Sequence, residues 1–162
     1  MTVKAGDKMP EAQLMHMSDA GPAPITTAEL FDGKTVALFA LPGAFTPTCS
    51  NQHLPGFIEK SEELRAAGVD TIVCLSVNDA FVMGAWGQQQ GATGKVMMVG
   101  DGNADLTEAL GLTMDGSGFG MGKRSLRYSM IVRDGVIESL NVEGNPGQAV
   151  DSGAENLLSQ LG

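Results

Sequence analysis

Long apolar runs are absent from this chain of 162 residues. The strongest run covers only residues 35–41, whereas a helix that crosses a membrane needs about 20 apolar residues. Residues 1–17 also lack the continuous apolar core of a secretory signal and the arginine richness of a transit peptide. We therefore expect no membrane partner and a cytoplasmic location.

Basic residues are scarce as well. The chain has 10 lysines and arginines against 19 aspartates and glutamates, so its formal net charge is −9. Nucleic-acid binding needs clustered lysine and arginine, and the densest cluster here is Lys123, Arg124 and Arg127. The charge balance argues against a nucleic-acid partner, and we expect Lys123 and Arg124 to be solvated.

Cysteine is nearly missing too. The chain has two cysteines, Cys49 and Cys74, which are too few for a disulfide framework and do not form a Cys-x-x-Cys pair. In a reducing compartment each of them would be a free thiol. The surroundings of each cysteine are therefore the first question that the sequence raises.

What the chain does contain is typical of a globular α/β protein. Hydrophobic residues make up 43% of it and charged residues 18%. No internal repeat or low-complexity linker divides it, so we predict a single domain over residues 1–162. Three continuous apolar runs predict strands covered on both faces, and Asp134-Gly135 predicts a hairpin between two further strands. These strands are predicted at residues 35–41, 70–77, 95–99, 125–132 and 136–142.

Apolar residues at helical spacing predict helices between and after the strands. Pro55 is expected to kink the first helix, Asp79 to cap the second and Gly111 to end the third. Ser152 and Glu155 form the pattern of a capping box before the last helix. The four helices are predicted around residues 54–65, 81–86, 103–110 and 157–161.

The order of these elements predicts the fold class. Alternating strands and helices imply a mostly parallel central sheet, to which the closing hairpin adds antiparallel strands. A mixed central sheet with helices on both faces is the thioredoxin-like arrangement. We therefore expect an α/β protein with a thioredoxin-like fold.

The segment that follows the first predicted strand has a distinctive build. Pro42-Gly43 turns the chain, Thr46 suits a helix N-cap, and Pro47 suits the first helical position. Cys49 then falls in the first turn, where backbone N–H groups and the helix dipole favour the thiolate, which is the nucleophilic form of cysteine. Open α/β sheets also place their sites after the carboxyl ends of strands. These residues predict that Cys49 is reactive.

This segment resembles a known family. Its Pro42, Thr46 and Cys49 match the active-site signature of the peroxiredoxins, Pro-x-x-x-Thr-x-x-Cys. The full wording Pro-Gly-Ala-Phe-Thr-Pro-Thr-Cys, followed by His53-Leu-Pro-Gly-Phe57, is similar to the type II, or atypical, branch. The resemblance extends over about residues 4–161. Further matches are residues 74–82, the pair Trp86-Gly87 and residues 127–130.

The resemblance implies a thiol-dependent peroxidase that reduces hydrogen peroxide and organic hydroperoxides. The thiolate of Cys49 would attack the terminal peroxide oxygen, which gives a sulfenic acid and releases water or an alcohol. Thr46 would hold the peroxide in line and Pro42 would close the pocket and shield the sulfur from water. Arg127 would stabilise the thiolate and the charge that develops on the leaving oxygen. Because the sulfur carries the electrons, no metal or other cofactor is implied.

His53 and Cys74 allow two interpretations each. His53 also matches the family and lies one helical turn beyond Cys49, so it either tunes the thiol or merely packs, with packing slightly favoured. A metal site at Cys49 and His53 would need further ligands at plausible spacing, and the sequence offers none. Cys74 is most simply an inert core thiol, and the alternative is a resolving cysteine that captures the sulfenic acid.

The source of electrons is predicted from the second cysteine. Many atypical members carry a resolving cysteine near the carboxyl terminus, but residues 148–154 hold no cysteine here. Members with a second cysteine that matches Cys74 include plant-like forms recycled by glutathione and glutaredoxin. We therefore expect a one-cysteine cycle, reduced by glutathione with glutaredoxin or by another external thiol such as thioredoxin.

Three expectations concern the periphery of the site. Phe45, Trp86 and Phe119 could form an apolar rim for organic peroxides, although packing is the simpler role for Trp86. The glycine-rich run 116–122 does not follow a strand and open a helix, so it predicts a loop beside the pocket rather than a phosphate cradle. By analogy with type II members we expect a homodimer.

Two other functions stay open. A peroxide sensor or redox relay would pass oxidation from Cys49 to a partner protein, whereas a thioredoxin-like chaperone would not need the cysteine. Turnover with a small thiol favours the enzyme, and a stable mixed disulfide with one protein favours the relay. Activity that survives Cys49→Ser favours the chaperone.

Overall fold

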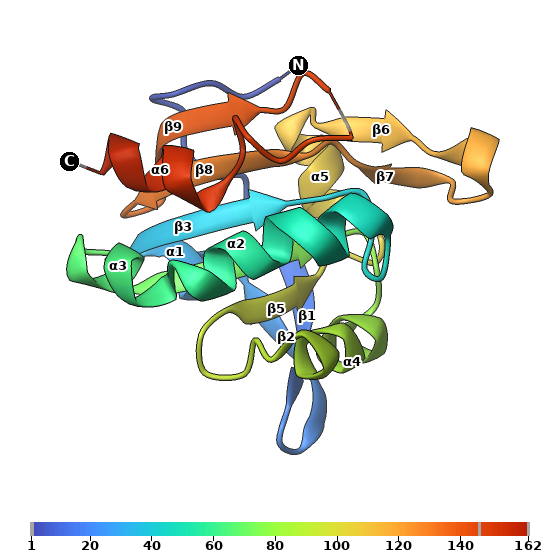
Figure 1. The fold of residues 1–162 in the computed structure, drawn as a ribbon. Helices are drawn as coiled ribbons and strands as arrows, with labels where there is room; N and C mark the ends of the chain where they lie inside the picture. Colours follow the sequence, from blue (N-terminus) through green and yellow to red (C-terminus); the bar gives the residue numbers. More distant parts are fainter. Residues whose placement is uncertain (1, 146, 162) are drawn as a thin grey trace.

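The computed structural model describes residues 2–145 and 147–161. Within them, seven strands form one sheet in the spatial order β2-β1-β5-β4-β3-β8-β9 (Figure 1). Two short strands, β6 (Thr113–Asp115) and β7 (Lys123–Ser125), form a separate hairpin that projects from the body. The strands of the main sheet are β1 (Gln13–Ser18), β2 (Gly21–Thr26), β3 (Thr35–Ala40), β4 (Thr71–Ser76), β5 (Met97–Gly100), β8 (Tyr128–Arg133) and β9 (Val136–Val142).

Helices cover both faces of this sheet. Helices α2, α3, α4 and α6 contribute to one apolar core, and α1 and α5 contribute to the other. The prediction of a mixed sheet with helices on both faces is confirmed. The helices are α1 (Thr27–Phe31), α2 (Leu54–Glu59), α3 (Ser61–Ala66), α4 (Ala80–Gln90), α5 (Asp105–Leu110) and α6 (Ala154–Gln160), with a π-helical turn η1 (Cys49–His53) and a 3-10 turn η2 (Ser117–Phe119).

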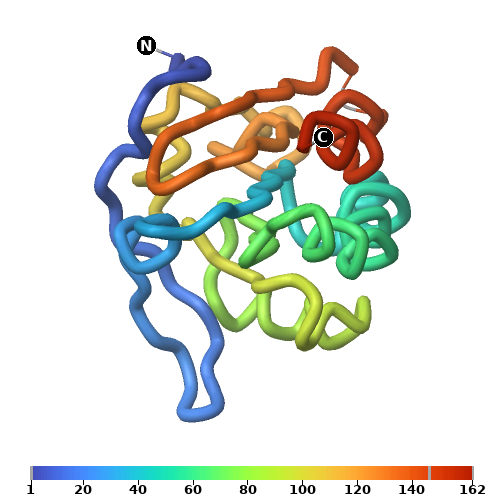
Figure 2. The backbone as a smooth tube through the Cα atoms, turned by 90° about the vertical axis from the view of Figure 1, so that its left-hand side faces the viewer, coloured from blue at the N-terminus to red at the C-terminus, as the bar shows by residue number. Residues whose placement is uncertain are grey.

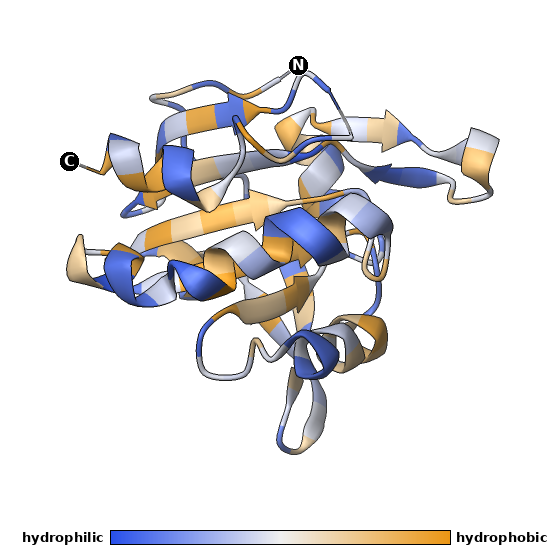
Figure 3. Cartoon of the chain, viewed as in Figure 1, coloured by the Kyte–Doolittle hydropathy of each residue, from blue (hydrophilic) through white to orange (hydrophobic). Residues whose placement is uncertain are grey.

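The central strand β3 shows why its sequence is apolar throughout. Successive side chains of a strand point to opposite faces, so Phe39 enters one core while Leu38 enters the other. Both faces are covered, and no position on β3 from Val36 onward is left for a polar residue (Figure 3). The predicted strands at 35–41, 70–77 and 95–99 correspond to β3, β4 and β5.

The expectation of a mostly parallel sheet is wrong. Only the β3–β4 and β4–β5 pairs are parallel among the described strands, and the remaining pairs are antiparallel. The difference comes from the β1–β2 hairpin, which extends away from the body in Figure 2 and which the sequence analysis did not identify. The sequence of β2 contains Pro22 and Pro24, and proline argues against a strand unless the strand lies at the edge of a sheet. β2 lies at such an edge, so its prolines are tolerated although they argue against predicting it.

The closing hairpin has the predicted turn. Asp134 and Gly135 both have positive φ angles, 49° and 77°, as a two-residue type I′ turn requires. The first strand of this hairpin is shorter than predicted, however. The stretch at 125–132 is interrupted, because Leu126 and Arg127 lie between β7 and β8 instead of within a strand.

The segment after β3 becomes helical at Pro47, as predicted, but the Thr46 hydroxyl donates to the Gly43 carbonyl, and among the described residues no N–H of this helix donates to it as a side-chain cap would require. The helix then widens into the π-helical turn η1, where the N–H of Leu54 donates to the carbonyl of Cys49. Pro55 follows this turn directly and has no N–H of its own, so the expected kink takes the form of a change in hydrogen-bond register. The predicted helix over residues 54–65 is divided at Lys60 into α2 and α3.

The other helix ends agree with the sequence except at α6. Asp79 accepts from the N–H of Val82 at the start of α4, and Gly111 ends α5 in the left-handed conformation. The predicted capping box of Ser152 and Glu155 is wrong, because Gly153 is the N-cap of α6 and Ser152 is engaged elsewhere. The single domain over 1–162 stays a prediction, and its two terminal residues lie outside the described part of the chain.

Candidate active site

The turn after β3 is held by several hydrogen bonds. The carbonyl of Pro42 accepts from Nη1 of Arg124 at 3.1 Å, and the N–H of Ala44 donates to Oδ1 of Asn78 at 3.0 Å. The Thr46 hydroxyl donates to the carbonyl of Gly43 at 2.7 Å. Three consecutive residues are thus fixed before the helix begins, which places the helix start at the carboxyl end of β3.

Gly43 allows this close packing. A Cβ atom added at Gly43 would lie 2.5 Å from Nη1 of Arg124, so any side chain there would displace the guanidinium. Arg124 also donates to the carbonyl of Met121 and is partly buried. The expectation that Arg124 is a solvated charge is therefore wrong. Lys123 is exposed and forms an ion pair with Glu108, as expected for a surface charge.

Cys49 is buried beside a cation. Its side chain is 0% exposed, and Nη2 of Arg127 donates to Sγ at 3.1 Å. Arg127 is itself 5% exposed and comes from the connection between β7 and β8, far from Cys49 in the sequence. A guanidinium that donates to sulfur in a buried setting stabilises the thiolate over the thiol. The structure thus brings together the two residues that the sequence analysis assigned to the chemistry.

His53 completes this cluster. Its Nδ1 lies 3.0 Å from Nη1 of Arg127, and its Nε2 lies 2.9 Å from the carbonyl oxygen of Ser152. A guanidinium can only donate and a carbonyl can only accept, so Nδ1 is the acceptor and Nε2 carries the hydrogen. Burial, and secondarily the charge of Arg127, lowers the pKa of His53 to about 3, against a smaller opposing effect of Ser152. His53 is therefore neutral near pH 7, and it contacts the Arg127 guanidinium as well as the rings of Phe39 and Phe57.

Comparison with known proteins identifies this arrangement. The Redoxin family matches residues 4–158. "Peroxiredoxin-2E-2, chloroplastic" of Oryza sativa subsp. japonica is 50% identical over 165 residues, which cover 99% of this chain and 73% of the relative. A crystal structure of reduced Prx3 in complex with H2O2 from Vibrio vulnificus has a TM-score of 0.94 and 49% identity, and the match covers 99% of this chain and 100% of that one.

The chain belongs to the peroxiredoxin family.

The expected thioredoxin-like fold is thereby confirmed, and this peroxiredoxin is a thiol-dependent peroxidase, an oxidoreductase. Peroxiredoxins work by cysteine redox chemistry with an external thiol as reductant and need no prosthetic cofactor. The described residues contain no group of three or more histidine, cysteine or acidic side chains that could hold a metal ion. Within them, no helix is long and apolar enough to cross a membrane.

The expected cytoplasmic location is wrong by this comparison. "Peroxiredoxin-2E, chloroplastic" of Arabidopsis thaliana is 44% identical over 164 residues, which cover 99% of this chain and 70% of the relative. Its name and that of the rice relative both state a chloroplast location. The composition of residues 1–17, on which the expectation rested, does not reveal where a protein of this family works.

The expected apolar rim of this peroxiredoxin is only partly present. Phe45 is 50% exposed, adopts a positive φ angle of 65° and lies with its ring 6.3 Å from the ring of Trp86. Trp86 is fully buried and donates from Nε1 to the Ser50 hydroxyl at 3.1 Å, so it supports the helix instead of lining a rim. Phe119 is 87% exposed at the tip of the β6–β7 hairpin, within the glycine-rich loop at 116–122.

Cys74 occupies a different environment. It lies in β4 between Phe39 on β3 and Met98 on β5, and it is 0% exposed. Burial raises the pKa of the Cys74 thiol well above its usual value, Cys49 acts in the same direction, and Arg127 opposes them. At neutral pH Cys74 is therefore a protonated thiol in the core, as the simpler interpretation holds.

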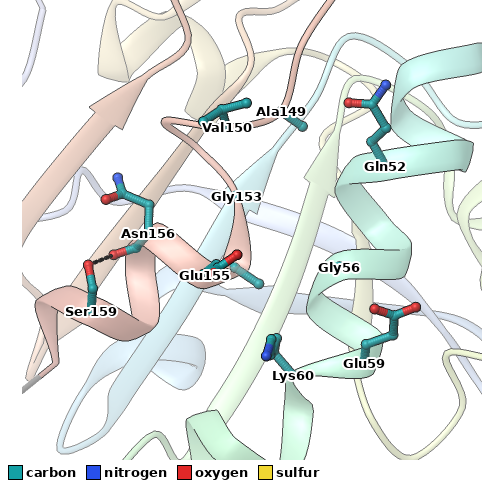
Figure 4. A pocket seen from close by; sticks show the side chains of 11 residues that line it. Gln52, Gly56, Glu59, Lys60, Ala149, Val150, Gly153, Glu155, Asn156 and Ser159 are labelled. Atoms are coloured by element: carbon teal, nitrogen blue, oxygen red, sulfur yellow. Dashed lines mark hydrogen bonds between the residues drawn. The ribbon is translucent and has the colours of Figure 1, made fainter.

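A cavity of about 510 Å³ lies beside the helix that begins at Pro47, contains Cys49 and continues into α2, here called the cysteine helix (Figure 4). Gln52 and Gly56 line one side, and Ala149, Val150 and Gly153 from the loop before α6 line another. Among the described residues, Cys49, Thr46 and Arg127 do not line it. The cavity therefore lies beside the cluster of Cys49, Arg127 and His53 and is separate from it.

Four residues of the site were missed by the sequence analysis. Asn78 and Arg124 hold the turn that contains Pro42, and Glu143 and Ser152 hold the loop that contacts His53. Asn78 lies within the family match at residues 74–82 and Arg124 lies shortly before the match at 127–130, which was the available signal. Glu143 and Ser152 had no signal, because their role depends on a contact between distant parts of the chain.

Proposed function

We propose that Cys49 is the peroxidatic cysteine of this thiol-dependent peroxidase. The observation that supports this most directly is the 3.1 Å contact from the Arg127 guanidinium to the buried Cys49 sulfur. The thiolate attacks the terminal oxygen of a hydroperoxide, so a sulfur–oxygen bond forms and the oxygen–oxygen bond breaks. Cysteine is oxidised to sulfenic acid, and the leaving oxygen takes a proton and departs as water or an alcohol.

Three neighbours are assigned roles in this step. Arg127 stabilises the thiolate and then the negative charge on the leaving oxygen. The Thr46 hydroxyl donates to Gly43 and retains lone pairs, so it can accept the O–H of a hydroperoxide and hold it in line. Pro42 has no N–H to compete for the sulfur, and the half-buried ring closes the pocket.

We assign the reductant to glutathione with glutaredoxin. The sulfenic acid of Cys49 condenses with one glutathione to a mixed disulfide and releases water, and a second thiol then releases the Cys49 thiol and forms a disulfide with the first. Two features support an external thiol: Cys74 is enclosed by the sheet, and residues 148–154 hold no cysteine.

We also assign a homodimer. Phe45 and Phe81 are large apolar side chains that are 50% and 63% exposed. Both follow strands of the parallel part of the sheet at their carboxyl ends, so they share one edge of the molecule. Sedimentation or light scattering of the wild type against Phe81→Ser tests this: a dimer that dissociates in the variant is expected, and a monomeric wild type contradicts it.

Peroxide consumption tests the assignment of Cys49. With dithiothreitol as reductant, wild type and Cys74→Ala should consume peroxide and Cys49→Ser should not. A panel of glutathione, glutathione with glutaredoxin, and thioredoxin then tests the reductant. Turnover that thioredoxin sustains and the glutathione system does not would contradict the assigned reductant and leave Cys49 in place.

A further inference from the structure

The orientation of Arg127 depends on few groups. Its Nη2 donates to Cys49 Sγ and its Nη1 donates to His53 Nδ1. In the part of the chain that the structure describes, its Nε has no partner and no carboxylate lies within ion-pair distance of its guanidinium. A planar guanidinium is directional, so a buried one with so few contacts takes its orientation from His53.

His53 is positioned in turn by the carbonyl of Ser152. The Nε2–H of His53 donates to this oxygen at 2.9 Å, across 99 positions of sequence. Its ring also packs against Phe39 and Phe57, which restrict its tilt without choosing between its two edges. The Ser152 carbonyl therefore decides which ring nitrogen faces Arg127.

Ser152 is anchored by one carboxylate oxygen. Oε1 of Glu143 accepts from the Ser152 N–H at 3.0 Å, from the Ser152 hydroxyl at 2.9 Å and from the Val150 N–H at 2.8 Å. Hydrogen bonds to an ionised acceptor are about twice as strong as neutral ones. Partial burial raises the pKa of Glu143, but these donors outweigh it and lower the pKa, so the carboxylate is ionised at neutral pH.

The chain of contacts closes on itself. The N–H of Glu143 donates to the carbonyl of Arg127 at 2.9 Å, so Glu143 is tied to the backbone of the same residue whose side chain lies at the other end. The hydrogen-bonded ring thus comprises Arg127, His53, Ser152 and Glu143. It joins the start of β8, the cysteine helix and the loop before α6, which are distant in the sequence.

We propose that Glu143 and Ser152 are positioning residues for the peroxide reaction, because they fix the carbonyl that orients His53 and, through it, the Arg127 guanidinium on Cys49. This inference rests on the proposed roles of Cys49 and Arg127. Neither Glu143 nor Ser152 contacts the reacting sulfur among the contacts that the described residues make. They therefore affect the orientation of the Arg127 guanidinium, and their removal should slow the reaction of Cys49 with peroxide that Arg127 assists.

The first test compares Glu143→Ala with Glu138→Ala. Both changes remove one negative charge near the same strand, but Glu138 pairs with Arg133 at the exposed end of β9. We expect Glu143→Ala to lower the second-order rate constant for peroxide by about 10-fold to 100-fold, the size expected from a small misplacement of an assisting group, and Glu138→Ala to leave it unchanged. Equal rates in the two folded variants would overturn the proposal.

The second test separates positioning from a general loss of structure. Glu143→Gln, which keeps an acceptor oxygen, should recover part of the rate that Glu143→Ala loses. In an Arg127→Lys background, Glu143→Ala should lower the peroxide rate constant little further, because the guanidinium that Glu143 helps to orient is absent. Additive losses in this double-mutant cycle would contradict an action through Arg127.

Thermal unfolding controls for stability. If Glu143→Ala does not fold, Glu143→Gln and Glu138→Gln replace the first pair, and a loss confined to Glu143→Gln supports the proposal while equal rates overturn it. Normal rates in the Glu143 variants beside an impaired Arg127→Lys would overturn only this inference. Normal rates in Arg127→Lys or Cys49→Ser would overturn the proposed function as well.

Discussion

The two cysteines of this peroxiredoxin are equally buried but differ in their backbone conformation and in the groups that contact the sulfur. Both are 0% exposed and belong to the same apolar core. Cys49 lies in a helix start and receives a hydrogen bond from Arg127, whereas Cys74 lies in a strand between two apolar neighbours. Burial raises the pKa of Cys74, as it does for a thiol without a charged donor. Burial by itself therefore does not distinguish the two cysteines; the charged donor beside Cys49 does.

The backbones of the two cysteines differ in a second way. β4 is hydrogen-bonded in parallel to β3 on one side and to β5 on the other, so exposing Cys74 would require opening the centre of the sheet. Cys49 begins a π-helical turn, where the carbonyl of Cys49 accepts from Leu54 instead of from the usual fourth residue. Exposing Cys49 would require only local loosening of this one turn, which costs much less free energy than opening the sheet.

The largest contrast is expected from removing each sulfur. Cys49→Ser should abolish peroxide consumption with dithiothreitol, because the serine hydroxyl stays protonated at neutral pH and its oxygen cannot be oxidised as the sulfur can. Cys74→Ala should keep a rate near that of wild type and lose some stability through the small cavity that it leaves. Peroxide assays and thermal unfolding of both variants measure the two effects, and equal loss of rate in two folded variants would erase the distinction between the cysteines.

The charged donor itself is tested by Arg127→Lys. A lysine ammonium cannot reach Sγ and His53 Nδ1 with the planar fork that Arg127 uses, so the peroxide rate constant should fall by about 100-fold to 1,000-fold, as for the loss of a transition-state donor. Stopped-flow measurement of sulfenic acid formation isolates this step. Arg133→Lys, on the exposed face of the same strand region, is the matched control.

The cluster around Cys49 also predicts an acid sensitivity. The unfolded chain protonates His53 near pH 6.5 and the folded chain only near pH 3, so between these values the unfolded state binds the extra proton. The contribution of His53 therefore destabilises the fold as pH falls below about 6.5, by up to about 1.4 kcal/mol per pH unit, and is absent above it. Denaturant unfolding of wild type and His53→Gln from pH 7 to 4 measures this contribution.

In that comparison the gap between the two stability curves should narrow toward acid, since His53→Gln has no proton to gain. Parallel curves would mean that the folded and the unfolded chain protonate His53 at the same pH, which would contradict its role as an acceptor from Arg127.

The smallest effect is expected at the turn before Cys49. Arg124→Ala removes the donor to the Pro42 carbonyl, and the peroxide rate constant should fall by about 10-fold, the size of one net hydrogen bond to a charged group. Lys123→Ala, which affects only an exposed ion pair, should not change it. A rate loss shared by both variants would mean that net charge, and not the turn, is responsible.

Much of the fold follows from local patterns. The continuous apolar runs predict β3 and β4, because both of their faces are buried, and Asp134-Gly135 predicts the closing hairpin, because two positive φ angles favour these residues. The β1–β2 hairpin escaped prediction, since Pro22 and Pro24 argue against a strand wherever its edge position is unknown. No local sequence pattern determines the order of strands in the sheet or the balance of parallel and antiparallel pairs.

The same division holds for the site. The sequence by itself determined the turn and the position of Cys49 in the helix start, because Pro42 and Pro47 act on their own immediate neighbours. Only the tertiary structure decided what faces the sulfur: Arg127 reaches Cys49 across 78 positions, and His53 reaches Ser152 across 99. Hydrogen bonds between distant segments depend on how the sheet and helices pack, so no local pattern could have fixed the hydrogen-bonded ring that includes Glu143.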